Sequence, residues 1–268
     1  MTTPPIQRIT SRENPMIKRL RQLSGQSNFY RTHGNFWLEG DHLCSAALLR
    51  GQTVTQAFFS ESLWESQSKL WLKCAPVITL LPDALFSFIS GLESPSHMGF
   101  LLELPEQKPI EPAMLTVVLD RLQDAGNVGS ILRSAAAFGV KQVLALKGTA
   151  ALWSPKVLRS GMGAHFGLQL NEGLSESDLD VLAVPRIATS SHQGPFLHEW
   201  MHHPDWPYPC AWLLGHEGQG LSESLLQSAK HCVRIAQPGG EESLNVAAAA
   251  AICLHSSASV HISARKNS

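Results

Sequence analysis

The chain has 268 residues, of which 44% are hydrophobic, and it carries 21 Lys and Arg against 22 Asp and Glu. This composition excludes a disordered chain, and the length suits two domains better than one. The longest uninterrupted apolar run, Val246–Leu254, is much shorter than the roughly 20 residues of a membrane span, so we expect no membrane partner.

The cysteines indicate the redox compartment. They are odd in number and scattered, and no C-x-x-C pair occurs among them: Cys44, Cys74, Cys210, Cys232 and Cys253. This pattern argues against a disulfide framework or a zinc cluster and fits a reducing cytoplasm. The first residues contain no apolar segment of the kind that directs secretion. We therefore expect a cytoplasmic protein that holds no metal.

Residues 1–34 carry a local excess of positive charge, with six Lys and Arg against one Glu. Such an excess predicts contacts to phosphates, although a solvated helix face of ordinary charge density would look the same. The candidate RNA-binding side chains are Arg12, Lys18, Arg19, Arg21 and Arg31.

The first hundred residues alternate between helical and strand patterns. We expect helices at Asn14–Leu23, His42–Arg50 and Leu85–Ile89, and strands at Val54–Ser60 and Val77–Leu81. This alternation predicts a small α/β or α+β domain over residues 1–105. Residues 104–113 contain three prolines and read as a linker, so a second domain is expected over 112–268.

After the linker the alternation becomes more regular. The predicted strands are Leu115–Leu119, Gln142–Leu146, Val181–Ile187, Ala211–Leu214 and Val233–Ile235. The predicted helices are Asn127–Phe138, Pro155–Gly161 and Leu244–Leu254. Strand, turn and helix repeated in this way predict an α/β fold, a mostly parallel sheet with helices on both faces.

Three segments of this second region combine glycine or small residues with a few polar side chains: 127–133, 215–221 and 243–247. Each begins where an apolar run ends, and ligands on parallel sheets bind beyond the carboxyl ends of the strands. We therefore predict an active site there, with the candidate catalytic residues Asn127, Arg133, Glu217, Ser243 and Asn245.

A competing motif is His198-Glu199-Trp-Met-His202, which matches the H-E-x-x-H pattern of zinc hydrolases. That chemistry needs both histidines on one face of a stable helix. Three prolines between residues 204 and 209 limit such a helix to little more than two turns. A zinc hydrolase therefore stays a remote alternative.

Three stretches, 124–135, 214–221 and 235–247, resemble the SpoU family, the TrmH-like branch of the knotted SPOUT class of methyltransferases. Ala125 and Ala236 stand where the family often has Pro, and His216 stands where it often has Asn. Residues 9–18, together with Phe36–Asp41 and Met98–Phe100, are similar to the substrate-binding domain fused to many members, which has a fold like ribosomal protein L30e.

The resemblance implies an RNA ribose 2′-O-methyltransferase that uses S-adenosylmethionine. It implies a deep trefoil knot in the C-terminal domain, an L30e-like N-terminal domain, and a homodimer with its site at the subunit interface. The N-terminal similarity favours ribosomal RNA over transfer RNA as substrate. The alternative from a different class is a catalytically inactive L30e-like/SPOUT module that only binds RNA.

The resemblance also assigns roles. Arg133 is the family's candidate for activating the ribose hydroxyl. Because arginine stays protonated in proteins, we expect it to clamp a phosphate and stabilise the developing alkoxide instead. Asn127 is expected to cap the helix of Arg133 or to orient that arginine. Glu217 is expected to hold the Gly-rich turn or to pair with Arg133. Helix capping competes with catalysis for Ser243 and Asn245.

The cofactor is expected to lie against backbone more than against side chains. Gly215, Ile235 and Leu244 match positions whose backbone receives the adenosine and methionine parts of the cofactor in the family. The full set of candidate cofactor-binding residues is Thr189, Gly215, Glu217, Gly218, Ile235 and Leu244.

Overall fold

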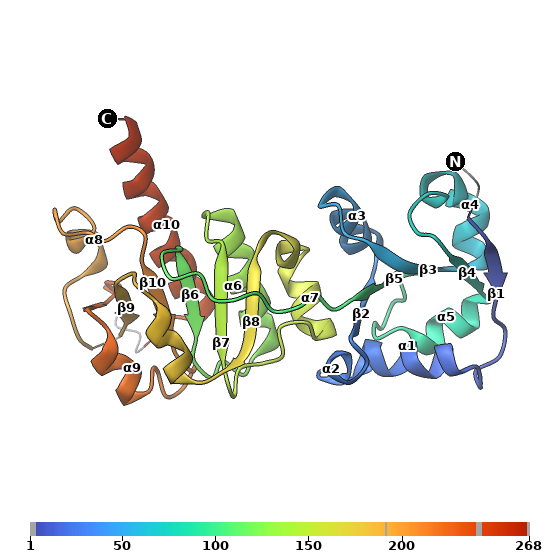
Figure 1. Cartoon of the computed structure of the whole chain (residues 1–268), viewed down its shortest axis with the longest axis horizontal. Coiled ribbons are helices and arrows are strands. Elements are labelled where there is room, and N and C mark those ends of the chain that lie inside the picture. Colours follow the sequence, from blue (N-terminus) through green and yellow to red (C-terminus); the bar gives the residue numbers. More distant parts are fainter. Residues whose placement is uncertain (1–3, 191, 240–242, 267–268) are drawn as a thin grey trace. The chain divides into compact units, whose positions relative to one another are not determined.

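The computed structural model describes residues 4–190, 192–239 and 243–266 (Figure 1). The chain forms two compact units. The first consists of Met1–Glu106 and Trp153–Phe166, and the second of Gln107–Leu152 and Gly167–Ser268.

The first unit contains a five-stranded sheet in the order β1-β4-β3-β5-β2. Its strands are β1 (Ile6–Arg8), β2 (Asn35–Glu39), β3 (Val54–Ser60), β4 (Ile78–Leu81) and β5 (Met98–Glu103). β1, β4 and β3 run parallel, while β5 runs antiparallel to both β3 and β2. The mixed sheet fits the predicted small α/β or α+β unit.

The described residues of this unit also form the helices α1 (Pro15–Gly25), α2 (Phe29–His33), α3 (Asp41–Leu49), α4 (Glu61–Trp71), α5 (Asp83–Ile89) and α7 (Pro155–Gly161). α1 begins where the sequence predicts, because the Asn14 side chain accepts the Met16 N–H at 2.8 Å and caps the helix. Phe58, Phe86 and Phe100 are fully buried and form part of the core.

The division of the chain differs from the predicted contiguous domains in the segment Trp153–Phe166, which packs with the first unit. The ring of Trp153 lies 4.7 Å from that of Phe36, and α7 packs on α1 and β2. Gly163 comes so close to Ala46 that a Cβ atom at Gly163 would lie 2.6 Å from the Ala46 Cβ. The Pro-rich linker is the only domain boundary that the sequence indicates. Nothing in it predicts that residues 153–166 belong to the first unit.

The second unit contains a six-stranded sheet in the order β11-β9-β10-β6-β7-β8, and every neighbouring pair is parallel (Figure 1). The strands are β6 (Thr116–Leu119), β7 (Gln142–Leu146), β8 (Gln169–Leu174), β9 (Arg186–Thr189), β10 (Ala211–Leu214) and β11 (His231–Val233). The predicted parallel sheet is therefore confirmed.

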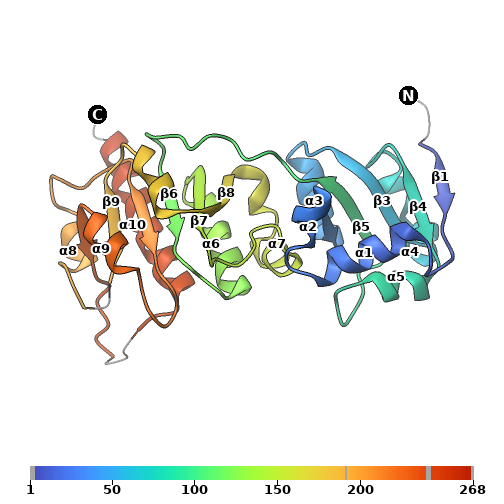
Figure 2. The ribbon, with the colours of Figure 1, turned by 60° about the horizontal axis from the view of Figure 1, so that its bottom comes forward.

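Helices cover both faces of this sheet (Figure 2). On one face α6 (Ala125–Ala137) packs against α10 (Val246–Lys266), and Trp212 of β10 donates to Ser257 of α10 at 3.0 Å. The next residue, Leu213, points to the opposite face because side chains alternate along a strand. There it shares a buried cluster with Leu179 of a 3-10 turn and Leu225 of α9 (Glu223–Ser228).

Two predicted strands are wrong in their bounds, and one strand is missing from the prediction. The strand expected at 181–187 lies at Arg186–Thr189. Its first expected residue instead ends a 3-10 helix, Glu176–Val181, which begins at a capping box of Ser175 and Asp178. The strand expected at 233–235 lies at His231–Val233, and β8 is absent from the prediction. β8 contains only two apolar side chains, Leu170 and Leu174, at the sheet edge, so it lacks the continuous apolar run of a buried strand.

α10 is longer than the predicted helix and has an unusual surface. Val246–Ala264 has the length and the mean hydropathy, 1.4, of a membrane-spanning helix, and only 28% of its most apolar window is buried. The longest uninterrupted apolar run in the sequence is shorter than this apolar helix, because Ser and His residues interrupt a segment that is otherwise mostly apolar. Its contacts with α6 and Trp212 place one face of α10 in the core of the second unit.

Candidate active site

The ends of neighbouring strands in the second unit meet at one edge of the sheet (Figure 1). Leu214, the last residue of β10, is in register with Leu119, the last residue of β6. Ala188 of β9 lies opposite both Leu213 and Cys232. The segments that follow β6, β10 and β11 therefore leave from the same carboxyl edge.

The segment after β10 is a tight turn that begins at Gly215. A Cβ atom on Gly215 would lie 2.2 Å from the backbone nitrogen of Leu221, so only glycine fits there. His216 and Gly220 exchange backbone hydrogen bonds of 3.0 and 2.8 Å. The His216 Nδ1 accepts the N–H groups of Gly218 at 3.0 Å and Gln219 at 3.2 Å. The Asn that the family often has at this position could accept the same two bonds through its side-chain oxygen. His216 therefore keeps the acceptor that the turn needs.

Two residues that the sequence analysis missed hold the same turn. Asp120, 2% exposed, receives two hydrogen bonds from the guanidinium of Arg121, at 2.8 and 2.9 Å, and one from the Ser222 N–H at 2.9 Å. Arg121 also donates to the Gln219 side chain at 3.2 Å. An acidic residue directly after a buried strand was the available signal, because such a charge needs local partners.

Glu217 joins the three predicted segments. Its carboxylate accepts the backbone N–H groups of Gln123 at 3.3 Å and Asp124 at 3.2 Å, and the side-chain amide of Asn127 at 3.2 Å. The Asn127 oxygen in turn accepts the side-chain amide of Asn245 at 2.9 Å. We call Asn127, Glu217 and Asn245 the polar hub.

The helix termini assign the capping roles. Asp124 caps α6 by accepting the Asn127 N–H at 2.7 Å, so the expectation that Asn127 caps this helix is wrong. Asn245 does cap α10, because its oxygen accepts the N–H groups of Ala247 at 2.9 Å and Ala248 at 3.3 Å. Its side-chain amide nitrogen is still available to donate to Asn127. Asn245 therefore caps α10 and also connects this helix to α6.

The environment of Glu217 favours its charged form. Desolvation by burial acts to raise the pKa of Glu217, but the hydrogen bonds donated by backbone N–H groups and by Asn127 outweigh it. The pKa of Glu217 is therefore lowered from its ordinary value of 4.5. The carboxylate is ionised at neutral pH and acts as an acceptor for the turn, while no pairing with Arg133 is observed.

Arg133 stands apart from the polar hub. It is exposed on α6, and its guanidinium has no hydrogen bond or ion pair with any residue that the structure describes. It lies six positions beyond Asn127, which is about 9 Å along the helix and on a different face. The structure thus gathers Asn127, Glu217 and Asn245 but leaves Arg133 free to meet an external group.

The remaining predicted residues surround the same edge. Thr189 ends β9 and donates to the Leu213 carbonyl at 3.2 Å, and Ile235 is half-buried just after β11. Leu244, 39% exposed, precedes α10. Ser243 is exposed, and its hydroxyl has no hydrogen bond within the described parts of the chain.

This edge fits the adenosine portion of S-adenosylmethionine. The Gly215 turn exposes backbone, Ile235 and Leu244 supply apolar contact, and the Gln237 Oε1 is buried with no hydrogen-bond partner among the described residues. An unpartnered buried acceptor of this kind needs a donor, which an adenine amino group or a ribose hydroxyl can provide.

Three of the predicted RNA-binding cations lie on the surface around α1. The guanidinium groups of Arg12 and Arg21 lie 4.8 and 5.5 Å from the centre of the Phe88 ring. Lys18 forms an ion pair with Glu13 at 2.6 Å, and both side chains are largely exposed. Arg12 and Arg21 thus share one aromatic platform, whereas Lys18 is partly neutralised.

The other two cations make contacts within the fold. Arg19 donates to the Asn35 side chain and to the His33 carbonyl, the latter at 3.3 Å. Arg31 donates to the Tyr30 hydroxyl at 3.2 Å and lies over the Tyr30 ring. Contacts with residues in or next to α2 therefore position the guanidinium groups of Arg19 and Arg31.

The zinc hydrolase motif has the wrong geometry. α8 covers only Leu197–Trp200 and ends before His202, so the two histidines do not share a helix. His198 is exposed and stacks on Phe196. Among the described residues there is no group of three or more His, Cys, Asp or Glu that could hold a metal ion.

Comparison with known proteins gives a consistent result. The SpoU rRNA Methylase family profile matches residues 114–255. An uncharacterized tRNA/rRNA methyltransferase of Synechocystis is 33% identical over 94% of both chains. The 23S rRNA (guanosine(2553)-2′-O)-methyltransferase of Bacillus subtilis is 28% identical, over 93% of this chain and 98% of that protein.

Solved structures agree with these relatives. The AdoMet-bound rRNA methyltransferase from Sinorhizobium meliloti superimposes with a TM-score of 0.81 at 26% identity, covering 96% of this chain and 98% of that one. The similarity extends over both units, and it confirms the predicted enzyme class and cofactor. Together with the polar hub at the sheet edge, these findings show that the chain belongs to the SpoU rRNA methylase family and is an S-adenosylmethionine-dependent RNA 2′-O-methyltransferase.

Proposed function

We propose that the substrate of this enzyme is a ribose 2′-hydroxyl of large-subunit ribosomal RNA. The support comes from relatives of full length whose names specify 23S rRNA, in Bacillus subtilis and in Streptomyces viridochromogenes. The observation that carries the catalytic assignment is the contrast between the bonded polar hub and the unpartnered Arg133.

The cofactor supplies a methyl group on a sulfonium, and its transfer is an in-line displacement in which alignment is the main requirement. Gly215, Ile235 and Leu244 would hold it through backbone and apolar contacts. The polar hub fixes the turn after β10 against α6 and α10, so Asn127, Glu217 and Asn245 act as positioning residues. Their side chains are largely occupied by one another.

Arg133 is the group proposed to touch the RNA. A guanidinium presents a planar fork that suits a phosphate, and it can stabilise negative charge that develops on the attacking ribose oxygen. Because it stays protonated, Arg133 is not the acceptor of the ribose proton. Ser243, exposed beside the hub, is proposed to contact the substrate as well.

The enzyme is proposed to work as a cytoplasmic homodimer without a metal. α10 supports the dimer, because Ile252 and Ile262 are 39% and 54% exposed on a helix that is otherwise anchored in the second unit. Burying such an apolar face against a second copy is favourable. Membership of the family supports the deep trefoil knot in the second unit and the L30e-like fold of the first.

The experiment that tests this proposal is mapping of 2′-O-methylation on ribosomal RNA by mass spectrometry. RNA from cells that lack the protein should have lost one methyl group in 23S rRNA, and the purified enzyme with the cofactor should restore it. Arg133→Ala protein serves as the inactive control. Restoration on transfer RNA instead would refute the substrate assignment and leave the enzyme class intact.

A further inference from the structure

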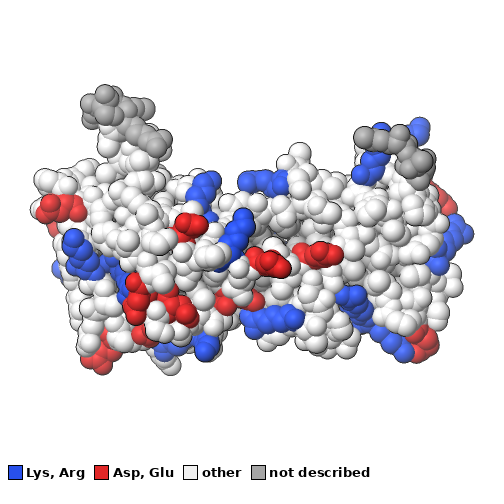
Figure 3. Space-filling model, in the orientation of Figure 1, with Lys and Arg blue, Asp and Glu red and all other residues white. Residues whose placement is uncertain are grey.

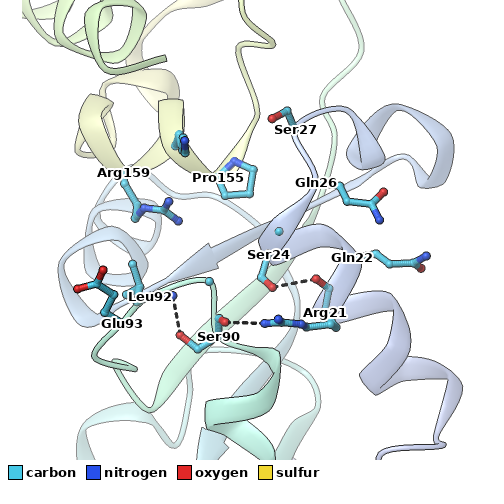
Figure 4. Close-up of a pocket in the computed structure, with 13 residues that line it drawn as sticks. Arg21, Gln22, Ser24, Gln26, Ser27, Ser90, Leu92, Glu93, Pro155 and Arg159 are labelled. Atoms are coloured by element: carbon cyan, nitrogen blue, oxygen red, sulfur yellow. Dashed lines mark hydrogen bonds between the residues drawn. The ribbon is translucent and has the colours of Figure 1, made fainter. Parts of the chain in front are cut away.

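A second polar hollow lies entirely within the first unit, whereas the polar hub lies in the second. It is a pocket of about 630 Å³ between the C-terminal end of α1, the loop after α5 and the helix α7 (Figure 4). Arg21 on α1 and Arg159 on α7 face it from opposite sides. Pockets of this volume hold ligands of the size of a drug molecule or a nucleotide.

The floor of the pocket is fixed by the fold. Glu39, 6% exposed, accepts the hydroxyl of Ser90 and the N–H of Gly91 at 3.2 Å. Arg21 donates to the Ser90 carbonyl at 2.9 Å, and a Cβ on Gly91 would lie 2.5 Å from the Ser24 carbonyl. The loop and the end of α1 are therefore locked together, so the hollow is preformed.

The charge of the lining is positive. Arg21, Lys156 and Arg159 line the pocket, against Glu93 as its one acidic lining residue. The whole chain has a net charge of −1, and the face drawn in Figure 3 mixes both signs. A local ratio of three cations to one acid therefore sets this hollow apart from the average of the chain and favours an anionic ligand.

Several polar side chains of the lining are not occupied by other residues that the structure describes. The side chains of Lys156 and Arg159 have no hydrogen bond or ion pair with any described residue, and the same holds for Gln22, Gln26 and Ser27. Lys and Arg are suited to phosphate, and amide and hydroxyl groups to ribose and base edges. Lys156, Gln22, Gln26 and Ser27 are exposed and Arg159 is half-buried, so both kinds of group are accessible to a ligand.

An aromatic surface continues from the pocket. Arg21 lies over the Phe88 ring as well as lining the hollow, and Arg12 lies over the same ring. Phe88 is half-buried, so part of its ring is accessible. Cations beside an accessible aromatic ring are typical of surfaces that bind single-stranded RNA.

We propose that this pocket, formed by Arg21, Lys156 and Arg159 with Gln22, Gln26 and Ser27, binds the sugar-phosphate backbone of an unpaired RNA segment. The proposal rests on the proposed function, and it adds an RNA contact in the first unit to the methyl-transfer site in the second. Two of its cations come from α7, a segment outside the N-terminal basic stretch.

The test compares two double variants with the same change of charge. Lys156→Glu/Arg159→Glu alters the pocket, and Lys69→Glu/Lys73→Glu alters exposed lysines of the same unit outside it. The affinity of full-length protein for a single-stranded RNA oligonucleotide and for a 23S rRNA transcript is measured over a range of salt. The pocket variant should bind roughly tenfold to a hundredfold more weakly, and its log–log salt slope should fall by about 1.4, because two phosphate contacts are lost.

Calorimetry with S-adenosylmethionine separates the two proposals, because both variants should bind the cofactor like the wild-type protein. An active wild-type enzyme whose pocket variant binds RNA no worse than the control variant would overturn the pocket assignment. Weakened RNA binding by the pocket variant, with a wild-type enzyme that does not methylate 23S rRNA, would leave the pocket standing and refute the substrate. Binding of adenosine monophosphate or inorganic phosphate as tight as binding of the RNA oligonucleotide would show a small-anion site instead.

Discussion

The two polar sites of this chain differ in how their side chains are satisfied. In the second unit, Asn127, Glu217 and Asn245 bond to one another and to backbone, so little capacity is left for a ligand. In the pocket of the first unit, Lys156 and Arg159 have no partner among the described residues. Lys156 is exposed and Arg159 is half-buried, so both cations are accessible to a ligand.

This difference separates residues that position the active-site turn from residues that contact a ligand. The polar hub shapes a turn against which the cofactor can lie, whereas open cations are held for phosphate. Arg133 resembles the pocket cations in this respect, although it lies in the same unit as the hub. The predictions below test that distinction, beginning with the largest expected effect.

Arg133→Ala should slow methyl transfer by about 10²–10³ in single-turnover assays, because a preorganised donor to the developing alkoxide is lost. Cofactor affinity measured by calorimetry should stay unchanged. Lys141→Ala, which removes another exposed cation from the second unit, is the matched control and should retain activity. Arg133→Lys should not rescue the rate, because lysine lacks the planar fork. A near-normal rate for Arg133→Ala would make this residue structural.

Gly215→Ala should destabilise the second unit by about 1–3 kcal/mol, because the added Cβ would overlap the Leu221 backbone and force the turn to shift. Cofactor binding should weaken with it. Gly218→Ala, in the same turn, is the control, since its Cβ would meet only His216 at an ordinary 3.8 Å. Equal thermal denaturation midpoints for the two variants would contradict the close-approach argument.

Glu217→Gln should lower the rate of methyl transfer about tenfold, because the charge that holds two backbone N–H groups is lost while the side-chain shape is kept. A double-mutant cycle with Asn127→Ala should show coupling, since the two side chains are in contact at 3.2 Å. Additive effects of the two changes would mean that the polar hub does not act as a unit.

The acid stability of the second unit should depend on Glu217. Its pKa in the folded protein is lowered from 4.5, so its contribution is fully present above about pH 4.5 and is lost as the pH falls through the folded value. The difference in thermal stability between wild type and Glu217→Gln should therefore be constant from pH 7 to 5 and shrink under stronger acid. A difference that grows on acidification would have the wrong sign.

His216→Asn should have the smallest effect, about 0.5 kcal/mol or less, because an Asn oxygen can accept the two N–H groups that the His216 Nδ1 now accepts. His216→Ala should cost more, since no acceptor remains. If Asn proved as harmful as Ala in thermal denaturation, the ring itself and not its acceptor would matter.

The pattern of the sequence was sufficient for the parallel sheet but not for the pairing around the site. Apolar runs located β6, β7 and β10 closely, because strands buried on both faces are continuous. The hub bond between Asn127 and Asn245 joins residues 118 positions apart, and no local pattern encodes such a contact. The resemblance to the family identified the candidate site residues, and the structure shows which of them are in contact with one another.

Local chemistry was misleading in two places. Asn127 looked like a helix cap because the apolar pattern begins there, yet Asp124 is the better-placed acceptor. The strand expected at 181–187 begins only at Arg186, and residue 181 ends a 3-10 helix that Ser175 and Asp178 cap. The pocket of the first unit was invisible, because Lys156 and Arg159 lie far in sequence from the α1 residues that they face.

The return of Trp153–Phe166 to the first unit also affects how the protein is made. During synthesis the chain emerges from its N-terminus, and domains normally fold as they appear. Phe36 has its neighbour Trp153 only after more than a hundred further residues have been translated. The first unit therefore stays incomplete, with the Phe36 side chain uncovered, until β6, α6 and β7 have been synthesised. A chain truncated at residue 106 remains in that unfinished state, and a fragment that begins at 107 carries α7 without the surface on which it packs.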